Sequence, residues 1–222
     1  MLHTMWSVKG GSGVSVTVAA TAATFAREQD RSLVVDLRGD QPAVLGVAEP
    51  RGPGVRDWLA SADASADALD RLLIDVGQGV WLLPSGTATD WPEDRPAQLV
   101  QALARMRCEV VIDAGVIDGP DLADQPLLTL GRVLAASGRS LMVVRSCYLA
   151  IRRAVTTGSV ADGLVVIVEP GRSVSAREVS SALHTPLVAT VMVDPAVARW
   201  VDSGQLLRRT HRVIGTSVRG VA

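Results

Sequence analysis

The sequence predicts a single α/β domain, covering residues 1–222, with helices on both faces of a doubly wound, mostly parallel sheet. Two observations lead to this prediction. Continuous apolar segments rich in β-branched residues recur along the chain and alternate with stretches of helical periodicity, which is the pattern of a parallel sheet covered on both faces. In addition, 48% of the residues are apolar and 20% are charged, which suits one globular domain with a sizeable core.

The first half of the chain begins with a strand, a glycine turn and a helix. Residues 2–8 are an apolar run that leads to the glycines, and the alanine-rich stretch 14–28 has small side chains that let a helix lie close to a sheet. Residues 32–36 form a compact β-branched run, and the glycines and prolines of 37–54 predict a loop. The remaining elements expected in this half are short helices around 55–62 and 65–73 and a strand at 80–83.

In the second half, leucine and methionine at helical spacing predict a helix over 95–106, and the run 109–113 predicts a buried strand that ends in an acid. Further helices are predicted at 127–136, 146–157, 197–201 and 206–218, and further strands at 141–144, 164–168 and 187–193. Ligands of parallel sheets bind outside the carboxyl ends of the strands. The glycines of 9–15, Asp36 and Asp113 all fall at such ends.

A glycine-rich segment follows the first strand and opens the first helix: Lys9, Gly10, Gly11, Ser12, Gly13, Val14, Ser15 and Val16. The backbone N–H groups of such a loop converge on an anion at the positive end of the helix. A tight turn that needs glycine for backbone reasons alone is the alternative. Lys9 is the only lysine among 22 lysine and arginine residues, and it stands directly before the glycines. We therefore take this segment as the candidate phosphate-binding site.

The segment resembles the deviant Walker A loop of the ParA/MinD group of P-loop proteins, whose pattern is K-G-G-x-G-K-[ST]. Other segments resemble the family in the same order along nearly the whole chain. They are the acid-ended strand Leu33–Asp36, the glycine-led Gly54–Leu59, the strand end Val80–Gly86, the Walker B-like strand Val110–Asp113 and the closing Asp194-Pro195 with Gly204. The resemblance implies a P-loop NTPase fold that binds ATP or ADP, with Ser15, Asp36 and Asp113 facing Mg²⁺.

Three positions depart from the family pattern. Val14 stands where the family has the lysine that neutralises phosphate charge. Arg38 stands at the second aspartate of the family's D-x-D, near the attacking water, so Asp36 and Asp40 are the remaining candidate catalytic acids. The late strand ends in Glu169 and lacks the asparagine that reads adenine in the family. These three changes together point away from efficient catalysis.

Part of a nucleotide site remains in the sequence. The glycines keep the anion-binding turn, and the residue matching Lys9 in the family reaches the phosphates of a partner subunit across a dimer. Losing a lysine–phosphate contact in a partly buried site costs a few kcal/mol, or roughly a hundredfold in affinity. We therefore predict weak or absent binding of ATP or ADP with Mg²⁺, and a pseudo-ATPase or a very weak ATPase.

The resemblance favours a ParA/MinD-like regulatory or positioning protein that acts through homodimerisation and partner proteins. The pilus-assembly branch of the family (TadZ/CpaE-like) includes members with altered Walker loops, so localisation of pilus or secretion machinery is the specific hypothesis. One alternative is a slow but genuine Mg-ATPase, in which Lys9 and Arg38 supply the missing charge. Another is a DNA-associated partition protein, which the net charge of −1 does not favour. The arginine-rich, lysine-poor composition indicates an actinobacterial origin.

The location of the protein is predicted from absent signals and from one basic segment. No apolar run approaches the roughly 20 residues of a membrane span, and the N-terminus lacks a signal-peptide pattern. We expect a cytoplasmic protein that a partner recruits to the membrane or the cell pole. The segment 206–221 carries Arg208, Arg209, Arg212 and Arg219 opposite apolar residues. It either packs on the sheet as a closing helix or lies peripherally on a membrane.

Overall fold

The computed structural model describes residues 1–118, 126–158, 160–210 and 221. Its strands are β1 (Leu2–Ser7), β2 (Ser32–Asp36), β3 (Ile74–Gly77), β4 (Val80–Leu83), β5 (Glu109–Val116), β6 (Arg139–Arg145), β7 (Gly163–Val168) and β8 (Leu187–Met192). Its helices are α1 (Val14–Gln29), α2 (Gln41–Leu45), α3 (Val55–Ala60), α4 (Ala66–Asp70), α5 (Arg95–Ala104), α6 (Pro126–Ala136), α7 (Tyr148–Thr157), α8 (Ala176–Leu183), α9 (Pro195–Asp202) and α10 (Leu206–Arg209).

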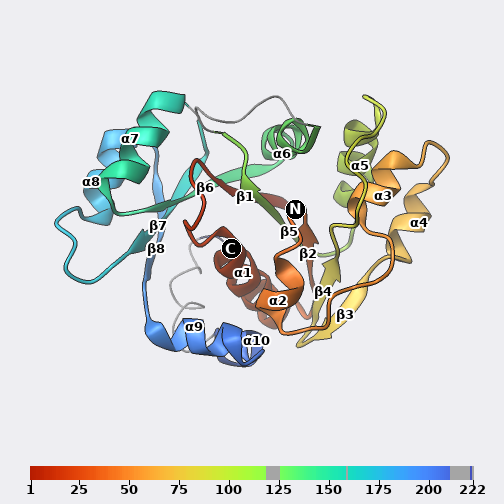
Figure 1. Ribbon diagram of the computed structural model, residues 1–222, viewed down its shortest axis with the longest axis horizontal. Helices are drawn as coiled ribbons and strands as arrows, with labels where there is room; N and C mark the ends of the chain where they lie inside the picture. Colours follow the sequence, from red (N-terminus) through yellow and green to blue (C-terminus); the bar gives the residue numbers. More distant parts are fainter. Residues whose placement is uncertain (119–125, 159, 211–220, 222) are drawn as a thin grey trace.

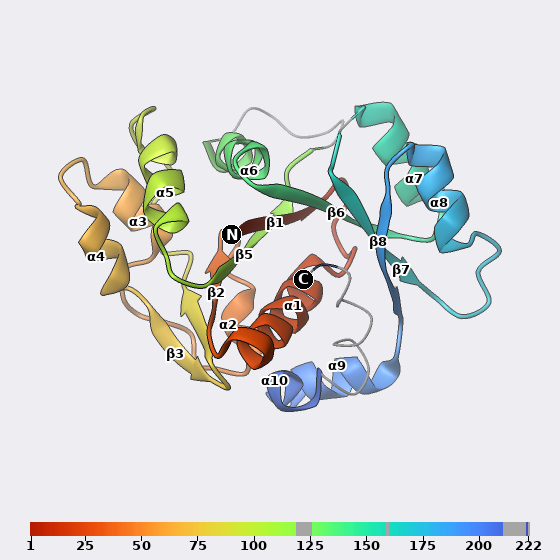
Figure 2. The same ribbon diagram turned by 180° about the vertical axis from the view of Figure 1, so that it is seen from behind.

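The strands form one eight-stranded sheet in the order β3-β4-β2-β5-β1-β6-β7-β8. Neighbouring strands are parallel except for β3 and β4. The chain moves from β1 toward one edge of the sheet, returns with β5 beside β1, and then moves toward the other edge (Figures 1 and 2). The carboxyl ends of β1, β2 and β5 therefore meet where the winding direction reverses, the usual ligand position in such sheets. The predicted fold class is confirmed.

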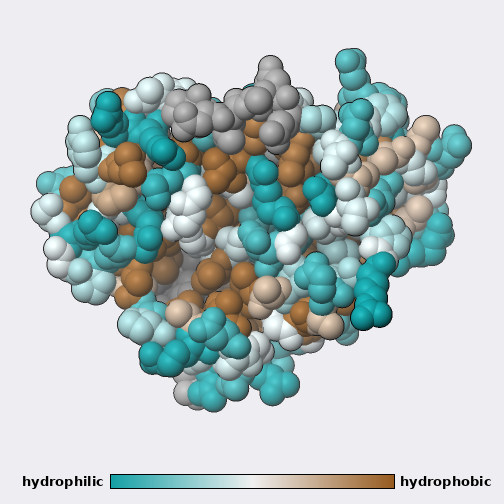
Figure 3. Space-filling view, in the orientation of Figure 1, coloured by the Kyte–Doolittle hydropathy of each residue, from teal (hydrophilic) through white to brown (hydrophobic). Residues whose placement is uncertain are grey.

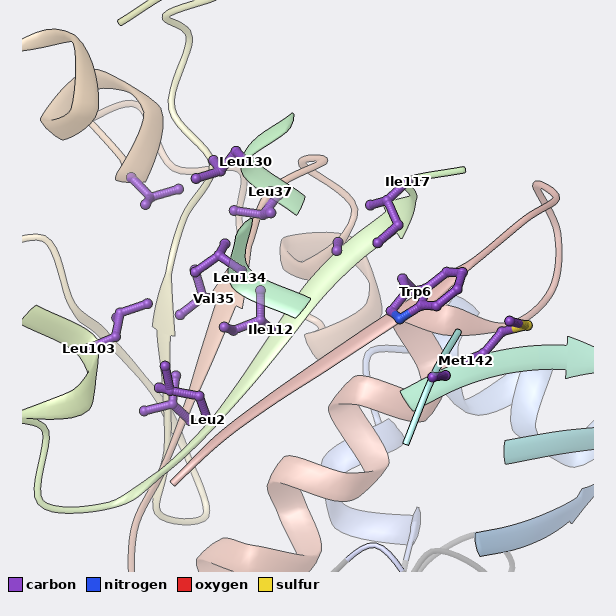
Figure 4. Close-up of a cluster of buried hydrophobic side chains, with 14 of the residues drawn as sticks. Leu2, Trp6, Val35, Leu37, Leu103, Ile112, Ile117, Leu130, Leu134 and Met142 are labelled. Carbon is purple, nitrogen blue, oxygen red and sulfur yellow. The ribbon is translucent and has the colours of Figure 1, made fainter. Parts of the chain in front are cut away.

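Helices cover both faces of the sheet, and each face has its own core. Helices α1, α2, α9 and α10 contribute to one core and α3 to α8 contribute to the other. Figure 4 shows Leu130 and Leu134 of α6 packed toward Val35 and Ile112 of the sheet. Val34 belongs to the opposite core, because successive side chains of a strand point to opposite faces.

Helix α1 lies against the middle of the sheet, beside β5 and β2. The side chains of Ala19, Ala20 and Ala22 are fully buried there, as the alanine-rich sequence predicts. The Ser32 hydroxyl at the start of β2 donates to the Ala22 carbonyl at 2.7 Å, which ties the helix to the strand. This close packing holds the N-terminus of α1 at the carboxyl edge of the sheet.

Helix α2 lies inside the segment 37–54, for which the sequence predicts a loop, and the prediction is wrong there. Pro42 occupies the first turn of α2, where its missing N–H needs no helical partner. Gly46 ends the helix with a φ of +73°, which glycine adopts without strain. The proline and glycine that predict a loop are thus the start and the stop of a short helix.

Strand β3 and helix α8 are also additions to the predicted elements. β3 pairs with β4 through a tight turn in which Gln78 and Gly79 have φ values of +58° and +77°. Helix α8 begins with a capping box between Ser175 and Glu178, a pattern that is readable in the sequence. Of the helix predicted over 206–218, the structure describes α10 and Thr210, which caps its C-terminus, and residues 211–218 lie outside the described residues. None of the described helices is long and apolar enough to cross a membrane.

Two glycine-containing segments that are far apart in the sequence form one joint. The N–H groups of Val55 and Arg56 donate to the carbonyls of Pro84 and Ser85 at 2.8 and 2.9 Å. A Cβ atom on Gly54 would lie 2.2 Å from the Pro84 oxygen, so no larger residue fits without movement of the backbone. This joint fastens α3 to the end of β4.

Candidate functional site

The glycine loop connects β1 to α1 at the carboxyl edge of the sheet. Gly11 and Gly13 have φ values of +72° and +90°, in the left-handed region that favours glycine. Among the described residues, the N–H groups of Gly10, Gly11 and Gly13 donate no hydrogen bond within the chain. The loop therefore presents free backbone donors at the start of a helix of 16 residues, the geometry that binds anions.

Side chains within the loop brace its backbone. The hydroxyls of Ser12 and Ser7 donate to the Lys9 carbonyl at 2.6 and 2.9 Å. The Lys9 ammonium nitrogen lies 3.3 Å from the Gly10 carbonyl oxygen. Val14, at the predicted lysine position, is 6% exposed and belongs to the core between α1 and the sheet. The one lysine thus contacts its own loop, and the side chain at the family's lysine position is buried and apolar.

Arg38, the residue at the second acid of the predicted D-x-D, lies across the end of β5. Its Nε donates to the Ala114 carbonyl at 3.0 Å, and its Nη2 donates to the Val116 carbonyl. Gly115 makes room for this side chain, because a Cβ there would lie 2.7 Å from the Arg38 Cγ. The guanidinium is held by backbone carbonyls, although the side chain still borders the cleft described next.

A cleft of about 530 Å³ lies over the glycine loop. It is lined by Ser7, Gly10, Gly11, Ser12, Gly13, Val14, Ser15, Val16, Arg38, Asp40, Ala43, Val44, Gly115 and Val116. The structure therefore brings the predicted phosphate-binding residues from Gly10 to Val16 together with Arg38 and Asp40, whereas Lys9 does not line this cleft. Asp40 is exposed at the rim of this cleft, whereas the other candidate catalytic acid, Asp36, is fully buried.

Asp36 and Asp113 stand opposite one another on the neighbouring strands β2 and β5, and neither is exposed. Asp36 Oδ1 accepts hydrogen bonds from the N–H groups of Arg38 and Gly39 at 2.9 and 2.8 Å. Its Oδ2 accepts from the N–H group of Gln41 at 3.0 Å. Asp36 therefore shapes the backbone of the loop that follows it.

Gln41 belongs to this site although the sequence pattern does not point to it. Its side chain is fully buried, and its Nε2 donates to Asp113 Oδ2 at 2.7 Å and to the Ser15 carbonyl at 3.0 Å. Asp113 Oδ1 accepts from the N–H group of Gly115 at 3.1 Å. A glutamine beside a proline carries no sequence signal for this role, because the contact depends on α2 starting at Gln41.

Burial dominates the electrostatics of the acid pair. It raises the pKa of Asp113 to about 6, against opposing hydrogen bonds from Gln41 and Ser15. Burial also raises the pKa of Asp36 above its ordinary value, although the N–H groups of Gly39, Arg38 and Gln41 act in the opposite direction. Two adjacent buried carboxyl groups disfavour double ionisation.

The predicted Mg²⁺ ligands, Ser15, Asp36 and Asp113, lie close together, but their arrangement does not fit a cation. Each of the four carboxylate oxygens already accepts at least one hydrogen bond. An amide nitrogen stands beside Asp113 Oδ2, and nitrogen donors repel a cation. Mg²⁺ requires oxygen ligands in near-octahedral geometry, and the donors of this chain occupy the same carboxylate oxygens.

A second, apolar slot of about 220 Å³ adjoins the glycine loop on its other side. Ile167, Val191 and Val197 line it, and Figure 3 shows apolar side chains gathered around a hollow of this face above α9. At the end of β7, where the family has its asparagine, Glu169 pairs with Arg145 and Arg172. The slot therefore has an apolar lining that could contact an adenine ring. The end of β7 has no amide side chain that could hydrogen-bond to that ring.

Comparison with solved structures identifies the fold. The chain is similar to the MinD cell division protein of Aquifex aeolicus, with 14% identity, a TM-score of 0.75, and coverage of 99% of this chain and 94% of that one. It is similar to a ParA family ATPase from Chlorobium tepidum TLS, with 16% identity, a TM-score of 0.74, and coverage of 98% and 95%. It is also similar to MinD complexed with Mg-ADP from Pyrococcus horikoshii OT3, with 19% identity, a TM-score of 0.70, and coverage of 99% and 93%.

No protein-family model and no curated protein sequence matches the chain. At such low identities the structural likeness shows the fold, which is that of the MinD and ParA type of P-loop ATPase. It carries no residue-level function, which depends on the side chains present here.

Proposed function

We propose that this protein is a ParA/MinD-like regulatory or positioning protein whose nucleotide site no longer supports turnover. It acts through dimerisation and through binding of partner proteins, and it localises a pilus or secretion machine of the TadZ/CpaE-like kind. The observation that carries the proposal is Val14, a buried apolar side chain at the loop position where P-loop enzymes place the phosphate-binding lysine. The glycine backbone geometry is kept, while the charge that binds and activates a phosphate is absent.

Within the described part of the chain, the surroundings of the loop offer no ready replacement for this charge. Lys9 contacts the Gly10 carbonyl, and Arg38 donates to two carbonyls at the end of β5. A phosphate would have to compete with these contacts to recruit either side chain. This arrangement supports weak binding of ATP or ADP and weighs against the slow Mg-ATPase as the leading function.

Partner binding is supported by a solved complex of a structural relative and by one surface of this chain. A MinC:MinD complex of Aquifex aeolicus is among the similar structures, so this fold carries protein-binding surfaces in a relative. In the present chain, Tyr148, Leu149 and Val155 of α7 are 75%, 47% and 58% exposed. Exposed aromatic and aliphatic side chains on one helix are typical of interaction surfaces. We place the protein in the cytoplasm, with recruitment to the membrane or cell pole by its partner.

Titration calorimetry with ATP and Mg²⁺ tests the proposal. Wild type is expected to show no heat at high micromolar ATP, whereas Val14→Lys is expected to bind roughly a hundredfold more tightly. Val14→Ala is the matched control, because it shortens the same side chain without adding charge, and it should behave like wild type. Tight binding of ATP by wild type would overturn the silent-site proposal.

Phosphate release separates the silent site from a slow ATPase. Mg²⁺-dependent release by wild type that disappears in Lys9→Ala would show that Lys9 supplies the missing charge and that the protein is an enzyme. Salt-sensitive, sequence-independent DNA binding would instead favour a partition protein. Sedimentation velocity with and without ATP reports the dimerisation that the proposal requires.

A further inference from the structure

The side chain of Gln41 joins the three segments that surround the acid pair. Its backbone N–H donates to Asp36 at the end of β2, and its Nε2 donates to Asp113 of β5 and to the Ser15 carbonyl of α1. All of these contacts are buried or nearly so, and Gln41 is 0% exposed. One residue thus connects two strands and a helix at the floor of the cleft.

The orientation of the Gln41 amide follows from its neighbours. Nε2 faces two oxygen acceptors at 2.7 and 3.0 Å, so exchanging Nε2 and Oε1 would place oxygen against oxygen. In the present orientation Oε1 is buried without a hydrogen-bond partner. An orphaned buried carbonyl costs free energy, and the two bonds of Nε2 to the carboxylate and to α1 offset this cost.

We propose that the Gln41 amide takes the place of a divalent cation at this acid pair. A cation bound there would draw Asp36, Asp113 and Ser15 together through its positive charge. Here the polarised N–H bonds of one amide draw Asp113 and the Ser15 carbonyl together, and backbone N–H groups satisfy Asp36. The end of β2, the end of β5 and the first turn of α1 are therefore held in one arrangement without metal.

This inference deepens the proposed function, because it describes the same cleft, but its test needs no nucleotide. A positioning protein of this kind keeps the loop after β2 in one state, whether or not Mg²⁺ is present. If the glycine loop binds an anion, the binding is therefore independent of divalent cations.

The test compares wild type with Gln41→Glu in the full-length, nucleotide-free chain. Mn²⁺, a paramagnetic substitute for Mg²⁺, is titrated by electron paramagnetic resonance, and the midpoint of thermal unfolding, Tm, is measured with Mn²⁺ and with EDTA. Wild type should bind no Mn²⁺ below millimolar concentration, and its Tm should be the same under both conditions. Gln41→Glu adds a third carboxylate, so its Tm in EDTA should fall by about 5 °C or more and recover when one Mn²⁺ binds.

A second variant and a control keep the outcome decisive. Gln41→Ala empties the space beside Asp113 without adding charge, and its Tm should also rise with Mn²⁺, by less than that of Gln41→Glu. It decides the test if Gln41→Glu does not fold. Gln101→Glu adds the same charge at an exposed position of α5 and should show no response to Mn²⁺.

Two results would overturn the inference. One is a wild-type chain that already binds Mn²⁺ below millimolar concentration or gains thermal stability from it. The other is the absence of any Mn²⁺ response in both Gln41 variants. Neither result bears on whether ATP binds to the glycine loop, so failure here is distinguishable from failure of the proposed function, which calorimetry with ATP decides.

Discussion

The glycine loop and the acid pair lie side by side at the carboxyl edge of the sheet, yet they differ in how far the chain satisfies its own polar groups. The N–H groups of Gly10, Gly11 and Gly13 have no acceptor within the described residues. Every oxygen of Asp36 and Asp113, by contrast, has a donor from the same chain. In the candidate site, the glycine loop that would bind an anion (the open half) has free donors, whereas the acid pair that would bind a cation (the closed half) has its oxygens occupied by donors of the same chain.

This contrast indicates that the fold retains the backbone features of a phosphate loop more easily than the side-chain chemistry. The φ values of Gly11 and Gly13 are properties of the turn between β1 and α1, which the fold needs in any case. A charged side chain at position 14 is needed only for phosphate. Val14 packs into the core, so a valine at this position adds apolar burial to the fold.

Replacing Asp36 with alanine should produce the largest loss of unfolding free energy, because it removes the hydrogen bonds on one side of the acid pair. Asp36→Ala leaves the N–H groups of Arg38, Gly39 and Gln41 without their acceptor in a partly buried loop. The expected loss is about 3–5 kcal/mol of unfolding free energy, measured by urea denaturation. Asp40→Ala is the control, because its carboxylate is exposed and its loss should cost less than about 0.5 kcal/mol. Equal effects of the two substitutions would contradict the described geometry.

The pH dependence of stability should show the next largest effect. Burial raises the pKa of Asp113 from 3.8 to about 6, so the folded chain holds this proton more tightly than the unfolded chain. Lowering the pH from about 7 to about 4 should therefore add up to about 3 kcal/mol of stability from this group. Burial lowers the pKa of His3, so the unfolded chain binds this proton more readily and lowering the pH through the same range reduces the stability of the folded chain. The contributions of His3 and Asp113 therefore have opposite signs.

The contribution of Asp113 is isolated by subtracting the pH profile of Asp113→Asn from that of wild type. The difference should change between about pH 4 and about pH 7 and be flat above that range. A difference that is flat throughout would mean that Asp113 titrates near its ordinary value. The closed half would then be more open to solvent than the structure indicates.

A lysine at position 14 should add charge to the glycine loop and lower the stability of the nucleotide-free chain. The Val14 side chain is 6% exposed, so Val14→Lys without nucleotide should lose about 1–3 kcal/mol of unfolding free energy through loss of apolar contacts and burial of charge. ATP should restore part of this loss by binding the folded state. Urea denaturation with and without ATP measures both effects, and Val14→Ala should show the loss without the recovery.

The smallest expected effect is a difference in stability between alanine substitutions at Gly11 and Gly10, two neighbouring residues of the glycine loop. Gly11→Ala forces a Cβ into a φ of +72° and should cost about 1 kcal/mol. Gly10 has no positive φ, and a Cβ added there would meet no atom within 4 Å, so Gly10→Ala should change stability by less than about 0.5 kcal/mol. Thermal unfolding of the two variants gives the comparison, and a greater loss for Gly10→Ala would mean that the loop adopts another turn.

Much of the fold was predictable because its signals are local. The β-branched run at 32–36 and the alanine-rich stretch after Gly13 carry their own periodicity and became β2 and α1. The capping box of Ser175 and Glu178 is an equally local signal for the start of α8. Helix α2 was not predictable in this way, because Pro42 and Gly46 are as compatible with a loop as with the two ends of a short helix.

The candidate site also contains features that were predictable from contiguous residues and features that were not. The glycine loop was predicted from the order of its residues, since a strand, a glycine turn and a helix are contiguous in the chain. The roles of Gln41 and Arg38 were not, since each depends on contacts with β5 more than 70 positions away in the sequence. The predicted Mg²⁺ ligands lie close together, but the donors that surround them are backbone N–H groups and the Gln41 side chain, whose positions no contiguous pattern in the sequence specifies.

The amino-acid sequence was sufficient to predict the α/β class, the order of the main elements, the glycine loop, and the absence of a lysine from position 14. These follow from periodicity and from contiguous residue types. Three features became visible only in the folded chain: Val14 is buried in a core, carbonyls of β5 hold Arg38, and Gln41 donates to the acid pair. Burial and hydrogen-bond satisfaction depend on neighbours in space, and the neighbours of these three residues are remote in the chain.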